Sequence, residues 1–268
     1  MSIFRNTDFG KNKHKSLLLY YIMIPKIIHQ IWIGPKKRPD IWIDTFRIDY
    51  INKNPEYQYF LWNEYNIEQL FVDFPIYRIV YDLETTYNGK SDILRYLILY
   101  IHGGIYIDAD MVWINEKSFD ELLEQVNDSG FFAGKNPDNL GPSTQKDKKF
   151  ENTICGAVMG SSKNNQLIRL LIDGIEKYII RDWGNTRIAK QDYIRKRNII
   201  GVCELIGPLY LSRMLSNKNI TNFPSIYFYP INWHNINDCN LHTKMELPKE
   251  SYTFQYGYST NNLSEYLI

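Results

Sequence analysis

The chain contains 268 residues, 44% of them hydrophobic, which is enough to bury a substantial core. Its 31 basic and 30 acidic residues nearly cancel, so the composition excludes strong bulk attraction to nucleic acid or to an anionic membrane, although local charged patches remain compatible with it. We expect one α/β domain with loop insertions over residues 17–268, preceded by a polar tail over residues 1–16.

The three cysteines, Cys155, Cys203 and Cys239, are widely spaced and form no paired metal-ligand pattern. We expect reduced thiols, as in a reducing compartment. The apolar run at residues 17–24 is far shorter than the roughly 20 residues that cross a bilayer, and no cleavage-site pattern accompanies it. The sequence therefore predicts a soluble, cytoplasmic protein without a transmembrane anchor.

The first part of the chain alternates strands and helices. Residues 24–34 read as a core strand, and a second strand is expected at residues 57–62. Short helices are expected at residues 66–71 and 76–84. The helix between the two strands, residues 39–54, is expected to draw its buried side chains from Ile41, Trp42, Thr45, Phe46 and Ile48. This order is typical of a nucleotide-binding α/β sheet, in which ligands lie beyond the carboxyl ends of the strands.

A further helix follows, for which Ser91 is the expected N-cap. Its buried stripe at helical spacing consists of Ile93, Leu94, Leu97, Ile98 and Ile101. Asp92 and Arg95 are three residues apart and are expected to project together away from that stripe. A surface ion pair is the alternative interpretation of these two residues.

Gly103 and Gly104 are expected to end this helix and to turn the chain into a strand at residues 105–109. Because side chains alternate along a strand, Tyr106, Asp108 and Asp110 are expected to share one face. The two carboxylates would repel each other unless a cation lies between them. A hard ion such as Mg²⁺ or Mn²⁺ prefers oxygen ligands and often shares them with a diphosphate, so the pattern favours a metal-bound nucleotide-sugar.

The pattern Ser-Asp-x-x-Arg-Tyr, followed by Gly-Gly-x-Tyr-x-Asp-x-Asp, resembles the DXD-containing sugar-binding region of the family-32 glycosyltransferases. More distantly, it resembles the glucosyltransferase domain of large clostridial toxins. Residues 24–34 resemble the family's opening strand, and Gly207-Pro208 matches a later Gly-Pro segment. The resemblance spans residues 24–260 and implies a GT-A type nucleotide-binding sheet flanked by helices.

The resemblance also implies roles for individual residues. Trp32 would stack on the nucleotide base, with burial at a strand end as the alternative. Asp92 and Arg95 would bind hydroxyls of the donor sugar, and Arg95 would lie near the diphosphate. Tyr106 would line the donor pocket, although such a residue can also simply cover the sheet. Asp108 would contact the ribose and a metal-bound water, and Asp110 would ligate the metal.

Two departures from the family pattern concern the later part of the chain. Gln255 stands where a His is expected and Thr260 where a Trp is expected, so Gln255 and Ser259 are the candidates for an additional metal ligand. Gly156 stands where the family often has an Asn, which implies altered contacts to the acceptor or donor sugar.

Other segments carry weaker predictions. Residues 134–152 read either as a loop that closes over an acceptor or as an ordinary surface insertion. Residues 165–180 read as an amphipathic helix, and residues 226–230 as a strand or a pocket-lining segment. His29 is interpreted as a core histidine and His102 as support for a helix end, whereas nothing local decides between structure and catalysis for His234 and His242.

The motif and the resemblance together predict a metal-dependent glycosyltransferase. The resemblance further implies retention of anomeric configuration and a UDP-sugar donor in preference to GDP-mannose. The acceptor would be a hydroxyl of a glycan, a protein or a small molecule. A catalytically decayed nucleotide-sugar-binding protein is one alternative. A haloacid-dehalogenase-type phosphatase is another, because residues 105–112 also fit that enzyme's Asp-x-Asp strand, but the later acidic residues are scattered and the Asp92–Arg95 helix would be unexplained.

Overall fold

The computed structural model describes residues 23–137, 153–179, 186–233, 236, 238–259, 261 and 263. The predicted tail at residues 1–16, most of the predicted loop at 134–152, and the residues His234 and Thr260 lie outside the described residues.

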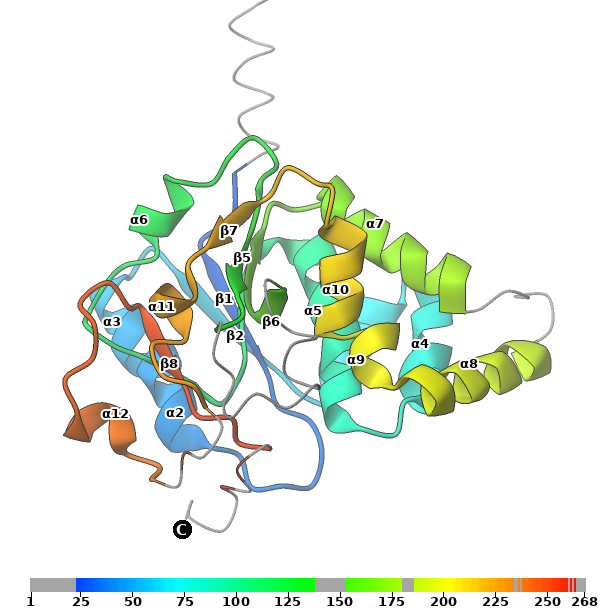
Figure 1. The fold of residues 1–268 in the computed structure, drawn as a ribbon, viewed down its shortest axis with the longest axis horizontal. Coiled ribbons are helices and arrows are strands. Elements are labelled where there is room, and N and C mark those ends of the chain that lie inside the picture. The colour runs from blue at the N-terminus through cyan, green and yellow to red at the C-terminus, as the bar shows by residue number, and fades with distance from the viewer. Residues whose placement is uncertain are drawn as a thin grey trace, which may run out of the picture.

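A six-stranded mixed sheet forms the centre of the molecule (Figure 1). Its strands, in spatial order, are β2 (Gln58–Trp62), β1 (Ile27–Ile31), β3 (Gly104–Ile107), β6 (Ile154–Ser161), β5 (Phe131–Lys135) and β7 (Thr221–Phe223). β1 runs parallel to both β2 and β3, whereas β6 runs antiparallel to its neighbours β3 and β5. The strands predicted within 24–34, 57–62 and 105–109 are therefore present.

The parallel pairing of β1 with β3 positions the site. Trp32 follows the last residue of β1, and Asp108 follows the last residue of β3. Because the two strands run in the same direction, both residues emerge at the same edge of the sheet. The predicted α/β class, with a central sheet flanked by helices, is confirmed.

One face of the sheet is covered by a helical layer (Figure 1). Its members are α4 (Pro75–Leu83), α5 (Tyr87–His102), α7 (Gln166–Gly174), α8 (Thr186–Ile200), α9 (Val202–Leu205) and α10 (Pro208–Leu215), with a 3₁₀ turn at Ile67–Phe71 and a π turn at Ile175–Ile179. The helices predicted at 66–71, 76–84 and 165–180 are thus present. Asn165 caps α7 through its side chain.

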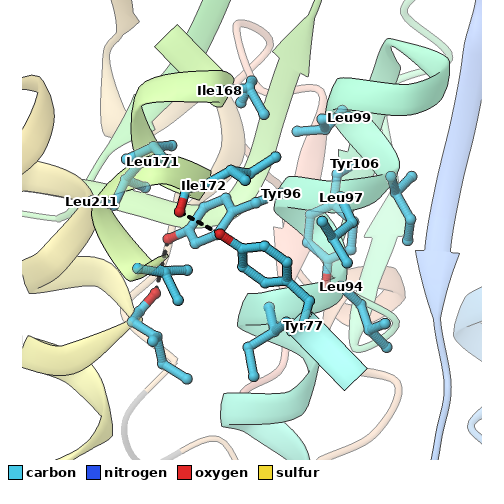
Figure 2. Close-up of a cluster of buried hydrophobic side chains, with 14 of the residues drawn as sticks. Tyr77, Leu94, Tyr96, Leu97, Leu99, Tyr106, Ile168, Leu171, Ile172 and Leu211 are labelled. Carbon is cyan, nitrogen blue, oxygen red and sulfur yellow. Dashed lines mark hydrogen bonds between the residues drawn. The ribbon is translucent and has the colours of Figure 1, made fainter. Parts of the chain in front are cut away.

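The core of this layer carries tyrosine hydroxyls within an apolar cluster (Figure 2). Tyr96 on α5 donates a hydrogen bond to the carbonyl of Ile206 over 2.9 Å. Tyr77 on α4 donates to the carbonyl of Ile172 on α7. These bonds satisfy hydroxyls that would otherwise be buried without partners, and they connect α5 to the segment before α10 and α4 to α7.

The opposite face carries smaller elements: α2 (Asp40–Asp44), a π turn (Thr45–Tyr50), α3 (Ile51–Lys53), α6 (Asp120–Leu123), α11 (Ser225–Phe228) and α12 (Leu241–Lys244). A two-stranded antiparallel sheet, β4 (Met111–Trp113) with β8 (Thr253–Gln255), lies on this side (Figure 1). A second apolar cluster fills the space between these elements and the central sheet.

The helical stretch at residues 40–53 confirms the predicted helix but buries a different set of side chains. Trp42 and Phe46 are buried as expected, whereas Ile41 and Ile48 are 51% and 46% exposed. Tyr50 is buried instead. The reason for the change after residue 45 is the π turn, which shifts the phase of the helix relative to an α-helical pattern.

At residues 226–230 the prediction of a strand was wrong. α11 occupies Ser225–Phe228, where the amide of Tyr229 donates to the carbonyl of Ser225 over 2.7 Å. Pro224 is the N-cap of this turn, with a φ of -54° and a ψ of 143°.

Candidate active site

The helix that carries the first site residues begins earlier than predicted. α5 starts at Tyr87, and its N-cap is Thr86, whose hydroxyl accepts a hydrogen bond from the amide of Gly89 over 3.2 Å. Ser91 is therefore not the cap but lies within the helix, where it lines a cavity. At the other end, Gly103 has a φ of 68° and Gly104 a φ of 94°, which confirms that these glycines turn the chain into β3.

Asp92 and Arg95 form a buried ion pair rather than a surface pair. Their side chains are 9% and 8% exposed, and the Arg95 Nη2 atom lies 3.0 Å from the Asp92 Oδ1 atom. Burial raises the pKa of Asp92 to about 7, while the charge of Arg95 opposes that rise. A surface ion pair contributes little, whereas a buried ion pair costs free energy because both charges lose their contact with water. The burial of this pair therefore indicates that the fold holds Asp92 and Arg95 in a specific arrangement.

Arg95 also connects strand β6, strand β3 and the turn that follows β3. Its Nη1 atom donates to the carbonyl of Gly156 on β6 over 2.6 Å, and its Nη2 atom lies 3.4 Å from Asp108 Oδ1. The guanidinium carbon lies 4.7 Å from the centre of the Tyr106 ring. Its Nε atom is buried without a hydrogen-bond partner. Arg95 is therefore the cation that lies beside Asp108 in the folded chain.

Two glycines make room for this pair. A Cβ atom on Gly156 would lie 2.5 Å from Arg95 Nη1, and one on Gly207 would lie 3.0 Å from Asp92 Oδ2. The departure from the family pattern at Gly156 thus has a physical reason, because a side chain there would displace Arg95. Gly207 precedes α10 and lets the chain pass close to Asp92.

Asp108 and Asp110 lie in the short turn between β3 and β4, so the predicted strand ends at Ile107 rather than at Ala109. Asp108 Oδ1 accepts a hydrogen bond from the Tyr106 hydroxyl over 2.6 Å. Burial raises the pKa of Asp108, although Arg95 and this hydroxyl oppose the rise. Asp108 is therefore oriented by neighbours on both β3 and α5.

Asp110 has one bound and one unbound oxygen. Its Oδ2 atom accepts from the backbone amide of Tyr258 over 2.8 Å, whereas its Oδ1 atom is buried without a partner. Burial, and then the charge of Asp108, raise the pKa of Asp110 to about 7, and the Tyr258 amide and Gln255 oppose the rise. A buried carboxylate oxygen without a donor is suited to a cation.

Gln255 is brought to Asp110 by the small sheet. In the β4–β8 pair, Met111 is directly opposite Gln255. Because Met111 follows Asp110 in the chain, this pairing places the Gln255 side-chain amide next to Asp110. The Gln255 Oε1 atom is also buried without a hydrogen-bond partner. Two unpartnered oxygens, from Asp110 and Gln255, therefore fit a hard divalent ion. The described residues contain no group of three or more His, Cys, Asp or Glu side chains that could hold a metal ion.

Trp32 and Ser259 lie at the cavity wall. The Trp32 indole donates to the carbonyl of Lys36 over 3.2 Å, and its ring meets the Tyr258 ring edge-on with centroids 5.3 Å apart. Trp32 is only partly buried, unlike a purely structural Trp such as Trp42. The Ser259 hydroxyl donates to Asn88 Oδ1 over 3.5 Å.

All the predicted residues converge on one cavity of about 730 Å³. Those that line it are Trp32, Asp92, Arg95, Tyr106, Asp108, Asp110, Gln255 and Ser259. The cavity also includes Asn136, Tyr258 and Trp233, which sequence analysis did not single out. Tyr258 contributes its backbone amide, and a backbone contact of this kind leaves no trace in the residue type.

Among the described histidines, His29, His102 and His242 do not line this cavity. His29 is buried, its Nδ1 atom accepts from the Trp62 indole over 3.1 Å, and its Nε2 atom donates to the carbonyl of Gly103 over 2.9 Å. The interpretation of His29 as a core histidine is confirmed. No helix among the described ranges has the length and apolar character needed to span a membrane.

Comparisons with known proteins agree with the predicted resemblance. Residues 39–128 match the family described as "Glycosyltransferase sugar-binding region containing DXD motif". The initiation-specific alpha-1,6-mannosyltransferase of Candida albicans is 26% identical over 240 residues, which cover 84% of this chain and 61% of that protein. Inositol phosphoceramide mannosyltransferase 3 of Schizosaccharomyces pombe is 36% identical over 89 residues, which cover 33% of this chain and 24% of that protein.

The solved structure titled "PaToxG Glycosyltransferase" is 22% identical to this chain with a TM-score of 0.48, and the match covers 78% of this chain and 76% of that chain. The chain spans less than two thirds of the length of both mannosyltransferases. The recognised resemblance is confirmed: residues 39–128 of this chain are similar to the DXD-containing sugar-binding region of glycosyltransferases.

Proposed function

We propose that this chain is a metal-dependent glycosyltransferase that moves a sugar from a nucleotide-sugar donor to a hydroxyl acceptor. The observation that carries the proposal is the pair of buried, unpartnered oxygens of Asp110 and Gln255 in the cavity that Asp92 and Arg95 also line. The family match over residues 39–128 supports the same conclusion.

Different residues of the cavity would bind different parts of the donor. Trp32, at the end of β1, would stack on the base, and Asp108, at the end of β3, would contact the ribose. Asp92 and Arg95 would bind hydroxyls of the donor sugar beside Tyr106. Asp110, assisted by Gln255 and with Ser259 as a weaker candidate, would hold Mn²⁺ or Mg²⁺. When bound, this ion would supply positive charge against the departing diphosphate.

Arg95 would contribute in two ways. It would place a fixed positive charge near the diphosphate, where negative charge grows in the transition state. It also binds Asp108, Asp92 and the carbonyl of Gly156, and so it keeps the donor-binding groups in one arrangement. We infer retention of anomeric configuration, as the family resemblance implies.

The donor and acceptor are the finer parts of the proposal. We favour a UDP-sugar, and GDP-mannose is the competing donor because the two similar proteins are named mannosyltransferases. One of those names refers to a lipid, inositol phosphoceramide, so a lipid acceptor joins glycans, proteins and small molecules.

The test is a panel of sugar nucleotides incubated with the protein and Mn²⁺, in which release of free nucleoside diphosphate is measured with and without a chelator. Metal-dependent release from one donor supports the proposal. Metal-dependent binding of a donor without any release would instead identify a decayed binding protein. Release of inorganic phosphate from a phosphate monoester would favour the phosphatase alternative.

A further inference from the structure

Helix α8 presents isoleucines on its solvent-facing side. Ile188 and Ile194 are each 47% exposed, and Ile199 is 70% exposed. The inner side of the same helix packs against the rest of the protein, since Tyr193 is completely buried there. α8 lies at the margin of the helical layer, beyond α4 and α9 (Figure 1). The exposed isoleucines are therefore a surface feature and not a gap in the core.

The same helix concentrates positive charge. Of its 15 residues, five are basic and one, Asp192, is acidic, so its net charge is 5 − 1 = +4, whereas the entire chain carries +1. Three of the basic residues, Arg187, Lys190 and Arg195, are exposed alongside the isoleucines. Asp192, whose side chain is 16% exposed, lies 2.8 Å from Arg195 Nη2, and this ion pair offsets part of the positive charge of the helix.

The inner side of α8 is hydrogen-bonded to Glu84, just before the start of α5. The Tyr193 hydroxyl and the Arg197 Nε atom donate to Glu84 Oε2 over 2.8 and 2.9 Å. Glu84 is 1% exposed and also accepts from the amide and the hydroxyl of Thr86, which caps α5. α8 is thus bound to the start of the helix that carries Asp92 and Arg95.

α8 also leads directly to the cavity rim. After Ile200 the chain turns at Gly201, and the next two residues, Val202 and Cys203, line the cavity. A surface that bound the outer face of α8 would therefore lie next to the opening of the site.

We infer that the outer face of α8, consisting of Arg187, Ile188, Lys190, Ile194, Arg195 and Ile199, is a docking surface for an anionic membrane. An interfacial helix places apolar side chains among the lipid head groups while its cations attract negatively charged lipids. A protein partner fits this face less well, because the cores of protein interfaces are depleted in charged residues and enriched in aromatic ones, whereas this face carries three cations and no aromatic side chain. A lipid-borne hydroxyl acceptor would then meet the cavity rim, a consequence that rests on the proposed function.

The test measures sedimentation of the full-length protein with vesicles, in the absence of donor or acceptor. We expect binding to vesicles of phosphatidylcholine mixed with phosphatidylserine, little binding to phosphatidylcholine alone, and weaker binding as salt is raised. Two double variants should each bind roughly tenfold more weakly or worse: Ile188→Ser/Ile199→Ser, which removes apolar side chains, and Lys190→Glu/Arg195→Glu, which reverses two charges. Each surface cation contributes on the order of a fivefold change in binding.

Matched controls are Val72→Ser and Lys218→Glu, which change an exposed apolar and an exposed basic residue outside α8. Both should bind like the unmodified protein, and all variants should keep the same melting temperature by circular dichroism. Absence of binding to anionic vesicles at low salt overturns the inference, as does equal binding of the α8 variants.

Sedimentation equilibrium tests the alternative that a second copy of the chain binds to this face of α8. A dimer that the α8 variants abolish, with vesicle binding unchanged, would contradict membrane docking. Because vesicle binding requires no turnover, its failure can be distinguished from failure of the proposed glycosyltransferase activity.

Discussion

At the residue scale, the motif identified the side chains of the site but not the state in which they are held. Asp92 and Arg95 were predicted to lie together, and they do, but their burial could not be derived from spacing alone. What buries them is the approach of β6 and of the chain before α10, where Gly156 and Gly207 leave room. Such contacts join residues more than 60 positions apart, and a local pattern does not encode them.

Gly156→Ala is expected to disturb the site through Arg95. The added Cβ atom would approach Arg95 Nη1 to 2.5 Å, so the guanidinium must move away from the Gly156 carbonyl and from Asp108. We expect a loss of roughly 1 to 3 kcal/mol in stability, typical of overpacking, and a larger loss in turnover than in nucleotide affinity. Urea unfolding and donor hydrolysis measure the two effects.

The control for this substitution is Gly201→Ala, because nothing lies within 4 Å of a Cβ atom there and only the φ of 79° is strained. That variant should lose roughly 1 to 3 kcal/mol of stability, because a φ of 79° with a ψ of 167° is a conformation that glycine adopts almost exclusively, and it should keep its turnover. Normal turnover in Gly156→Ala would show that the position of Arg95 is not important for the reaction.

Trp32→Ala tests the assignment of the base-binding residue. If Trp32 stacks on the nucleobase, free nucleoside diphosphate should bind more weakly by roughly 1 to 3 kcal/mol. Isothermal titration calorimetry measures the change, and Trp32→Phe should recover most of it because the ring is retained. Unaltered affinity in Trp32→Ala would mean that this Trp serves packing against Tyr258.

At the element scale, hydrophobic periodicity located most strands and helices, but boundaries depended on tertiary contacts. Both Thr86 and Ser91 are acceptable N-cap residues by type, and the sequence alone favoured Ser91. The buried Glu84, bound by Arg197 and Tyr193 from α8, holds Thr86 in the capping position instead. The π turn at Thr45–Tyr50 is a second such case, because no residue type in that segment requires it.

Thr86→Ala should weaken the start of α5. The variant loses the bond from the Gly89 amide and the bond to Glu84, so we expect the free energy of unfolding to fall by about 1 kcal/mol. Chemical denaturation measures this loss, and Thr86→Ser, which keeps the hydroxyl, should restore the original value. Equal stability of the alanine and serine variants would contradict the capping role.

At the scale of the whole molecule, the parallel order of β1 and β3 was predictable, and so was the meeting of Trp32 and Asp108 at one edge of the sheet. The arrival of Gln255 beside Asp110 was suggested only by the family resemblance, because it depends on β8 pairing with β4 across more than 140 residues. Pairings between distant strands are set by packing of the entire core and have no local signature.

The buried His29 makes the stability of the whole fold depend on pH. Burial lowers its pKa from 6.5 to about 3, against the opposing hydrogen bond to Gly103. Below pH 6.5 the unfolded chain therefore takes up a proton at this position that the folded chain does not, and the contribution of His29 to stability falls as the pH is lowered, whereas the raised pKa values of Asp92 and Asp110 act in the opposite direction. Between pH 7.5 and 4.5 this histidine should account for a loss of about 2.5 kcal/mol.

His29→Gln provides the comparison, because an amide can donate to the Gly103 carbonyl and accept from the Trp62 indole without titrating. Guanidinium unfolding at both pH values should show that the change in stability from pH 7.5 to pH 4.5 is more favourable in the variant than in the unmodified protein by about 2.5 kcal/mol. Identical losses would place the acid sensitivity elsewhere.

The most direct test of the central claim is the binding of Mn²⁺ in the presence of nucleoside diphosphate, measured by electron paramagnetic resonance for the unmodified protein and for Asp110→Asn. We predict one tight site in the unmodified protein and its loss in the variant, whose thermal stability should be little changed because the substitution removes a buried carboxylate held at a cost. Equal Mn²⁺ binding by both proteins would contradict the assignment of this cavity as a metal-bound nucleotide-sugar site.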